Sequence, residues 1–191
     1  RAAFQRPARA AAAGADAGDV APLVFPGRRM RGGHDEWMVR LDDRKGVDAV
    51  LGKRVELDRD AVELLRIHAA IPAVPVDVGP GDLPGEAGLE ADAISYTKGC
   101  YLGQEVMARL RSMGQVRRRL LRVRGPAGDV PPALPAQLFA GGRSVGELRS
   151  IARDAEGFIG WAMLTLMHVP AGARLGFAVD APPTVVLVDS P

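Results

Sequence analysis

The residue with the clearest capacity for covalent or metal chemistry is Cys100, the one cysteine of the chain. It lies in the segment Lys98-Gly-Cys-Tyr-Leu-Gly-Gln-Glu105, where two glycines flank the thiol and allow a sharp turn and the close approach of a ligand. Lys98 places an ammonium two residues away, and a helix beginning at Gly103–Glu105 would bring its N-terminal end near the sulfur. Both features favour thiolate over thiol. The segment therefore predicts a reactive or metal-coordinating sulfur on a partly exposed loop.

The alternative is that Cys100 is simply a small buried hydrophobic residue. No histidine base stands beside it, and on residue chemistry alone this alternative is favoured. A single thiol also excludes an intramolecular disulfide framework and a zinc site built from several thiolates. The three histidines, His34, His68 and His168, have no metal-ligand spacing, so we expect no metal site.

Length and composition are those of an ordinary globular chain. The chain has 191 residues, 47% hydrophobic and 25% charged, with a net charge of +2. These values exclude collagen-like and globally disordered chains, and the net charge gives no argument for a nucleic-acid or membrane partner. No run reaches the length of a membrane span and no signal peptide opens the chain, so we expect a soluble protein of a reducing compartment, most simply the cytoplasm. The start at Arg1 without Met indicates a fragment.

The first half of the chain contains one clear helix. Asp58 is a suitable N-cap for a helix over Arg59–Ala70, with Val62, Leu65 and Ala69 on one stripe. Short strands are predicted at 20–25, 37–41 and 93–96, and short helices at 45–51 and 106–110. The Pro-, Gly- and Asp-rich stretch Pro72–Gly88 is predicted to be a loop outside the core.

From residue 115 onward short apolar runs alternate with turn signals. The runs lie at 116–124, 137–139, 144–148, 158–166 and 184–188. This spacing is typical of a small barrel or sandwich. We therefore predict a first domain at 1–113 and a second at 114–191, with Trp37 and Trp161 in the core or at the domain interface.

The octapeptide Lys98–Glu105, preceded by LPGEAGLEADAISYT and followed by VMARLRSMGQVRRRL, closely resembles the signature of the YgfZ-type folate-binding proteins. These proteins are relatives of the glycine-cleavage T-protein, an aminomethyltransferase. The flanking similarity starts near Leu64 and continues through the C-terminal strands. The resemblance implies an α+β fold: a T-protein-like folate-binding domain, partial here, followed by a small C-terminal antiparallel β-barrel.

The resemblance also implies a function. It is that of a folate-binding accessory protein that supports iron–sulfur cluster assembly or repair, non-enzymatic or weakly catalytic, with an indirect connection to tRNA modification. The cofactor would be tetrahydrofolate or a derivative and the partners iron–sulfur client proteins. We expect a monomer without a membrane partner.

Within this resemblance Cys100 is the functional thiol, and Lys98 tunes it electrostatically. The implied folate-contacting residues are His68, Asp77, Glu86, Tyr101, Gln104 and Glu105. His68 stands where T-proteins hold a glutamate, and a neutral imidazole has one acceptor where a carboxylate accepts two donors, so folate binding would be weaker or differently arranged.

Each of these residues also has a structural interpretation. His68 could serve no ligand, Asp77 could cap a turn and Glu86 could anchor its loop. Tyr101 could pack the Cys100 loop against the core.

Two other functions remain open from the sequence. One is a tetrahydrofolate-dependent aminomethyltransferase or demethylase, against which stands the absence of the KGCY motif from T-proteins. The other is a tRNA-binding module using clustered arginines, since guanidinium groups pair bidentately with phosphates or carboxylates. The cluster comprises Arg109, Arg111, Arg117, Arg118, Arg119, Arg122 and Arg124. A solvated strand face is the simpler explanation for it.

Overall fold

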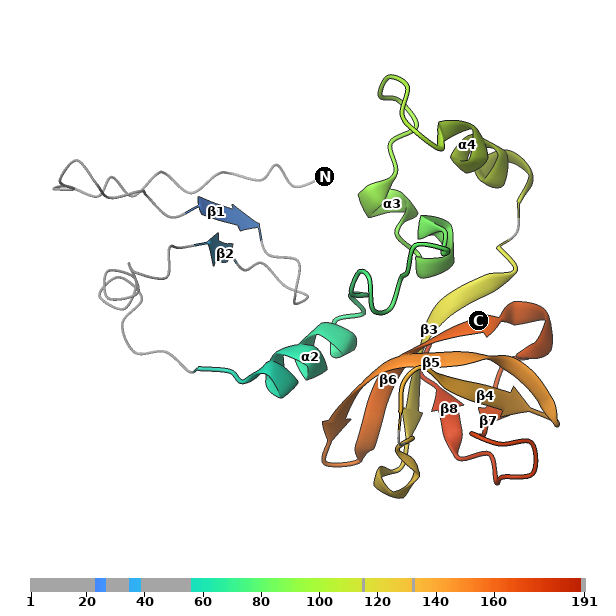
Figure 1. The fold of residues 1–191 in the computed structure, drawn as a ribbon. Coiled ribbons are helices and arrows are strands. Elements are labelled where there is room, and N and C mark those ends of the chain that lie inside the picture. Colours follow the sequence, from blue (N-terminus) through green and yellow to red (C-terminus); the bar gives the residue numbers. More distant parts are fainter. Residues whose placement is uncertain (1–22, 27–34, 39–55, 115, 132, 190–191) are drawn as a thin grey trace, which may run out of the picture. The chain divides into compact units, whose positions relative to one another are not determined.

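The computed structural model describes residues 23–26, 35–38, 56–114, 116–131 and 133–189 (Figure 1). The chain divides into two compact units, one formed by Arg1–Gly27 and Gly32–Val55, the other by Arg28–Arg31 and Glu56–Pro191. In the first unit β1 (Leu23–Pro26) pairs antiparallel with β2 (Asp35–Met38), close to the two predicted strands. The helix predicted at 45–51 lies outside the described residues.

The second unit contains a nearly closed six-stranded antiparallel barrel (Figure 1). Its strands are β3 (Arg118–Gly125), β4 (Ala136–Ala140), β5 (Arg143–Asp154), β6 (Gly157–Thr165), β7 (Arg174–Leu175) and β8 (Val185–Leu187). They hydrogen-bond in the order β4-β5-β6-β3-β8-β7, and a bridge between Phe139 and Gly176 joins the two edges. The α+β class and the predicted C-terminal barrel are therefore confirmed; only the two-residue β7 was not predicted.

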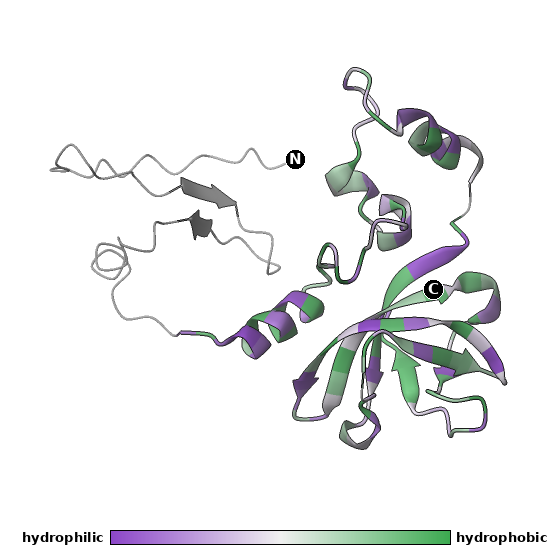
Figure 2. Ribbon diagram, viewed as in Figure 1, coloured by the Kyte–Doolittle hydropathy of each residue, from purple (hydrophilic) through white to green (hydrophobic). Residues whose placement is uncertain are grey.

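Apolar side chains at alternate strand positions fill the inside of the barrel. This inner cluster consists of Leu121, Val123, Leu138, Val145, Leu148, Phe158, Ala162, Leu164, Val169, Leu175 and Val185. Figure 2 shows both hydrophobic and hydrophilic residues along the barrel strands, but β6 does not alternate between them, because both of its faces are buried.

Helix α2 (Arg59–His68) begins where the sequence predicts it. The Asp58 carboxylate accepts a hydrogen bond from the Ala61 N–H at 2.7 Å, which satisfies one of the free donors of the first turn. The predicted apolar stripe is partly wrong, because Leu65 is 38% exposed whereas Ile67 is fully buried. The buried face is set by contact with β5 and β6 rather than by the helix alone.

A second apolar cluster lies on the outer face of β3, β5 and β6. It consists of Ile67, Val78, Leu120, Ala152, Ile159, Trp161 and Met163. Every residue of β6 from Gly157 to Leu164 is buried, because this strand is covered on both faces. Trp161 was predicted to lie in the core or at the domain interface, and the structure shows it in the core, since only 4% of it is exposed.

Two predictions for the chain between Pro72 and Tyr96 are wrong. The stretch Pro72–Gly88 is not outside the core: Asp77, Val78 and Glu86 are buried, and Pro84–Ala87 forms a 3-10 helix, η2. The predicted strand at 93–96 is instead the end of helix α3 (Glu90–Ala93) followed by irregular chain. The first error arises because the burial of Asp77 and Glu86 depends on partners distant in sequence, Ser150 and Arg118.

Helix α4 (Gln104–Met113) follows the Cys100 segment, with Gly103 as its N-cap at φ +85°. It begins within Gly103–Glu105, as predicted, and is longer than the predicted helix at 106–110. Two further 3-10 turns, η3 (Ala127–Asp129) and η4 (Leu166–His168), join barrel strands. The boundary at residue 113 stays a prediction. Within the described residues no helix is long and apolar enough to cross a bilayer.

Candidate functional site

Cys100 lies in the irregular loop between α3 and α4, and it is exposed (Figure 1). Two hydrogen bonds shape this loop: the Lys98 N–H donates to Ser95 Oγ at 3.2 Å, and the Gln104 N–H donates to the Tyr101 carbonyl at 3.2 Å. The thiol is therefore presented to solvent on a turned loop rather than packed as a small hydrophobic residue. Its reactivity stays a prediction.

Each tyrosine near the thiol carries a cation on its ring. The Lys98 ammonium lies 4.7 Å from the centre of the Tyr101 ring, and the Arg111 guanidinium lies 4.2 Å from that of Tyr96. Both distances are those of cation–π contacts. The Tyr101 hydroxyl is buried and has no hydrogen-bond partner within the described residues. The loop thus contains one orphaned polar group beside the thiol segment.

Gln104 and Glu105 form the first turn of α4. Gln104 is partly buried, whereas the Glu105 side chain is 88% exposed and pairs with Arg109 one turn later at 3.1 Å. Such an exposed helical pair contributes only a few tenths of a kcal/mol. Glu105 therefore remains open to solvent.

His68 stands at the C-terminal end of α2. Its ring is 46% exposed, with Nε2 3.9 Å from a carboxylate oxygen of Asp154, and its backbone carbonyl accepts a hydrogen bond from Arg122 at 2.8 Å. The structure thus places His68 where α2 meets β3 and β5.

Asp77 is completely buried and fully engaged. Its carboxylate accepts hydrogen bonds from Arg66 at 2.6 Å, from the Ala73 N–H at 2.7 Å and from the Ser150 hydroxyl. Burial disfavours the charge of Arg66, but Glu63 and Asp77 outweigh this effect and raise the pKa of the guanidinium above its ordinary value. Asp77 fastens the chain after α2 to β5.

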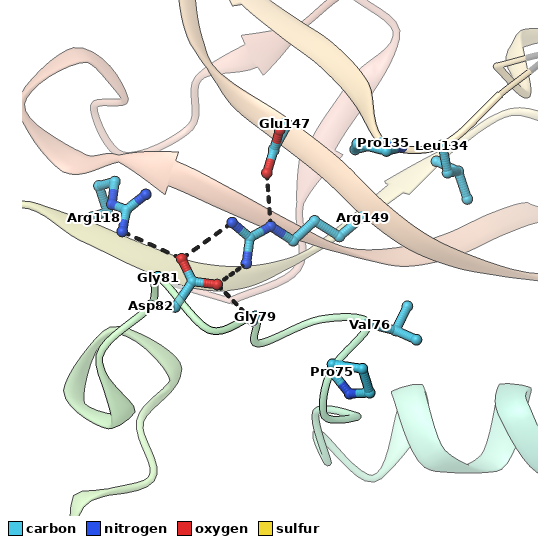
Figure 3. Close-up of a pocket in the computed structure, with 10 residues that line it drawn as sticks. All are labelled: Pro75, Val76, Gly79, Gly81, Asp82, Arg118, Leu134, Pro135, Glu147 and Arg149. Atoms are coloured by element: carbon cyan, nitrogen blue, oxygen red, sulfur yellow. Dashed lines mark hydrogen bonds and ion pairs between the residues drawn. The ribbon is translucent and has the colours of Figure 1, made fainter.

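Glu86 and Asp82 belong to an ion-pair group that we call the Asp82 cluster: Asp82, Glu86, Arg118, Glu147 and Arg149. Figure 3 draws these residues except Glu86. Glu86 accepts two hydrogen bonds from Arg118, each at 2.9 Å, and Figure 3 shows Asp82 lying between two guanidinium groups. The Arg149 hydrogen bond, opposed by burial and aided by the Gly79 N–H, lowers the pKa of Asp82. Four members of the cluster, Asp82, Arg118, Glu147 and Arg149, line a depression of about 480 Å³ in which their charges pair with one another.

The structure separates the predicted site residues into two groups. Lys98, Cys100, Tyr101, Gln104 and Glu105 lie together in one continuous segment, whereas His68, Asp77 and Glu86 lie where α2 and the chain after it pack on the barrel. The folate-contacting roles stay predictions. In this structure the carboxylates of Asp77 and Glu86 are already taken by internal donors.

No family model matches the chain. Among curated proteins, the tRNA-modifying protein YgfZ of Serratia proteamaculans is 35% identical over 122 residues, covering 61% of this chain and 37% of that protein. The mitochondrial iron-sulfur cluster assembly factor IBA57 of Homo sapiens is 36% identical over 126 residues, covering 57% and 34%. The tRNA-modifying protein YgfZ of Edwardsiella ictaluri is 33% identical over 145 residues, covering 73% and 44%.

Over about 60% of its length the chain is a homologue of the YgfZ and IBA57 proteins. The resemblance expected from the octapeptide is thus confirmed. The chain spans only 34% to 44% of the length of these three curated relatives.

Sequence reasoning missed most of the polar contacts in this YgfZ/IBA57 homologue. It expected the arginine cluster to be a solvated face, yet Arg118, Arg122 and Arg124 pair with carboxylates. These arginines alternate along β3 on the face that carries the outer apolar cluster, where α2 and the chain after it cover the sheet. The alternation was visible in the sequence, but the covering segment was not.

Proposed function

We propose that this chain is part of an accessory protein for iron–sulfur cluster assembly or repair, with Cys100 as its working thiol. The human relative is an iron-sulfur cluster assembly factor and the bacterial relatives are tRNA-modifying proteins. The two descriptions would be connected if tRNA-modifying enzymes depend on iron–sulfur clusters that such a factor helps to assemble. The observation that carries the proposal is the exposed thiol within the Lys98–Glu105 segment.

The chemistry of a single thiol limits what Cys100 can do. Iron–sulfur clusters are held by several ligands, usually four cysteine thiolates. The described part of the chain contains no group of three or more His, Cys, Asp or Glu side chains that could hold a metal ion. A cluster that contacted Cys100 would therefore take its remaining ligands from a client protein. A transient contact of this kind suits a factor that acts on clusters belonging to other proteins.

Tetrahydrofolate is the proposed small ligand, and the residues fit it unevenly. Tyr101 offers an orphaned hydroxyl, and the Gln104 side chain makes no hydrogen bond within the described residues. Asp77 and Glu86 do not fit, because internal donors occupy their carboxylates. Of the residues predicted to contact folate, His68 and those of the Cys100 segment are thus still available to it, and we assign no chemical step to folate.

The proposed role is non-enzymatic or weakly catalytic. No contact in the described residues favours an aminomethyl transfer, and four arginines of the cluster that could hold tRNA are engaged in ion pairs. The accessory role is therefore the one that we carry forward.

The test is complementation of cells whose own gene for the complete protein is deleted. The complete gene is reintroduced in native form, with Cys100→Ser, or with Leu102→Ser as a matched control. Leu102 is a fully exposed neighbour in the same loop, at 103% relative exposure. We expect the native form and the Leu102 variant to restore the activity of an iron–sulfur enzyme under oxidative stress. The Cys100 variant should leave it near the level of the deletion strain.

Immunoblotting of each variant separates loss of function from loss of protein. Full restoration by Cys100→Ser would remove the thiol from the mechanism. Failure of the native form to restore activity would overturn the iron–sulfur role itself.

A further inference from the structure

A second and larger depression, of about 1390 Å³, lies between α3, α4, the start of β3 and η4. We call it the α4 groove. Its apolar lining consists of Ile94, Met107, Leu110, Val116, Leu166 and Met167. The lining residues come from η2, α3, α4, β3 and η4 and from the chain between them, so the groove exists only in the folded chain.

Helix α4 presents one face to this groove. Met107, Leu110 and Arg111 line it, with Gly114 directly after the helix, a spacing that places them on one side. Across the groove Met167 is 80% exposed. Methionine side chains are flexible and polarisable, and they adapt to apolar surfaces of varied shape. The lining is therefore suited to receive another apolar surface.

The charges of the groove are unbalanced. Arg111, Arg117 and Arg119 line it, and none of them forms an ion pair within the described residues. Among the described lining residues Glu90 is the one carboxylate. The Asp82 cluster is different, because its arginines all meet carboxylates. The α4 groove thus leaves positive charge that an acidic ligand could neutralise.

The size and lining of the groove favour a peptide over a small molecule or RNA. Pockets for small molecules usually measure about 300 to 1,000 Å³, and this groove is larger. Single-stranded RNA is bound through free aromatic faces, whereas Tyr96 in this groove already stacks with Arg111. An apolar stripe flanked by charge is the surface that receives an amphipathic helix.

We propose that the α4 groove binds an amphipathic helix of a partner protein. The apolar face of that helix packs on Met107, Leu110 and Met167, and its acidic side chains pair with Arg111, Arg117 and Arg119. The proposal does not depend on the role proposed for Cys100, because no lining residue belongs to the Lys98–Glu105 segment; Ile94 and Tyr96 line the groove from the part of the loop before it.

The test is selection from a displayed library of helical peptides that share a fixed leucine stripe. Flanking positions vary among Glu, Ser and Lys, so the library contains acidic, neutral and basic helices of equal apolar area. We expect the complete protein to enrich Glu at the flanks. The best acidic peptide should bind at least about tenfold more tightly than its Lys counterpart, because like charges repel across an interface.

Charge-reversed variants locate the binding. Arg117→Glu with Arg119→Glu should weaken the selected peptide about tenfold or more. The matched control is Arg153→Glu with Arg174→Glu, which reverses two exposed charges on β5 and β7 outside the groove and should leave the affinity within about twofold. The peptide comparison uses the native protein, so it does not depend on the folding of a variant.

Several results would overturn the proposal. The first is that the selected peptides show no enrichment of Glu at their flanks. The second is that the Arg153→Glu, Arg174→Glu control loses as much affinity as the groove variant. The third is that self-association of the protein displaces the peptide. Displacement by a short oligouridine whose binding needs Arg117 and Arg119 would assign the groove to RNA instead.

Discussion

Asp77, Asp82 and Glu86 show how acidic residues can lie in a packed layer. A buried carboxylate is costly unless donors replace its water. The Asp77 carboxylate accepts hydrogen bonds from Arg66, from a backbone N–H and from a hydroxyl. The Glu86 carboxylate accepts hydrogen bonds from Arg118 and from the Leu83 N–H. With these donors in place, an acidic stretch rich in Pro and Gly packs against a barrel.

The stability of the chain should therefore depend on the ionisation of Asp82. Its folded-state pKa is lowered, chiefly by the Arg149 hydrogen bond, so the stabilisation is present above the ordinary carboxylate pKa of about 4 and is lost as pH falls through the lower folded value. We expect the free energy of unfolding of the native chain to fall as pH decreases below about 4. The Asp82→Asn variant should be less stable at neutral pH and should fall less steeply. Urea unfolding of the native chain and of Asp82→Asn, measured from neutral pH to below pH about 4, gives the free energy of unfolding of each and its pH dependence.

Glu156→Gln serves as the control for this measurement. Glu156 pairs with Arg124 at 3.1 Å, but its side chain is 78% exposed, so its ion pair contributes little. Its pH dependence should match that of the native chain. An unchanged pH slope in Asp82→Asn would show that the Asp82 cluster does not couple folding to pH.

Strand β6 is the element on which the packing of the second unit depends. It pairs with β3 on one side and β5 on the other, and both of its faces are covered. Gly160 lies at its middle, where a Cβ would stand 2.3 Å from the backbone oxygen of Ser150. Gly160→Ala would therefore force β5 away from β6 and break contacts in both apolar clusters.

We expect Gly160→Ala to lower the free energy of unfolding by about 3 kcal/mol, because backbone atoms cannot yield as a flexible side chain can. The control is Gly128→Ala in η3, where a Cβ meets nothing within 4 Å and the change should be within about 0.5 kcal/mol. Equal stability of the two variants in urea unfolding would contradict the close approach of β5 and β6.

The elements that could be predicted from the sequence are those whose signals are local. Asp58 and the turns between barrel strands act on neighbouring residues, and both appear where predicted. The burial of Asp77 and Glu86 depends instead on Ser150 and Arg118, which lie 73 and 32 residues further along the chain. No local pattern in a single sequence reveals such a pairing.

The candidate site follows the same division. The Cys100 segment was predictable because its chemistry lies within eight consecutive residues. The α4 groove was not, because α3, α4, β3 and η4 each supply part of its lining. Helix α2 was partly predictable. Its N-cap was, because that signal is local, but the burial of Ile67 rather than Leu65 was not, because it depends on the strands that α2 contacts.

At the scale of the second unit, the two apolar clusters share strands. Leu121 and Val123 face the barrel interior, whereas Leu120 faces the outer cluster with Ile159 and Trp161. Helix α2 and the chain after it cover this outer surface (Figure 1). The barrel strands therefore carry apolar residues on both faces.

This arrangement predicts how fragments behave. A fragment of residues 114–191 would expose Leu120, Ile159 and Trp161 and should self-associate, because contiguous exposed apolar patches of this kind drive association. Residues 56–191 should stay monomeric and unfold cooperatively. Light scattering measures self-association. Trp161 fluorescence measures unfolding of each fragment, because the remaining tryptophan, Trp37, lies outside both fragments.

A 114–191 fragment that is monomeric and as stable as 56–191 would contradict this prediction. It would instead support the boundary at residue 113 that the sequence suggests. Near-UV circular dichroism provides the control, since a packed Trp161 gives a signal that an aggregated or loosened fragment lacks.

The position of Cys100 has a consequence for how the protein can evolve. Residues 97–103 contribute no buried side chain to either apolar cluster, whereas almost all of β6 is buried. Substitutions at the exposed loop positions 97–100 and 102 therefore cost little folding free energy, whereas Gly103 is constrained by its φ of +85° and β6 by packing. Selection can retain or replace the thiol for its chemistry alone, and the barrel can diverge under a separate set of constraints.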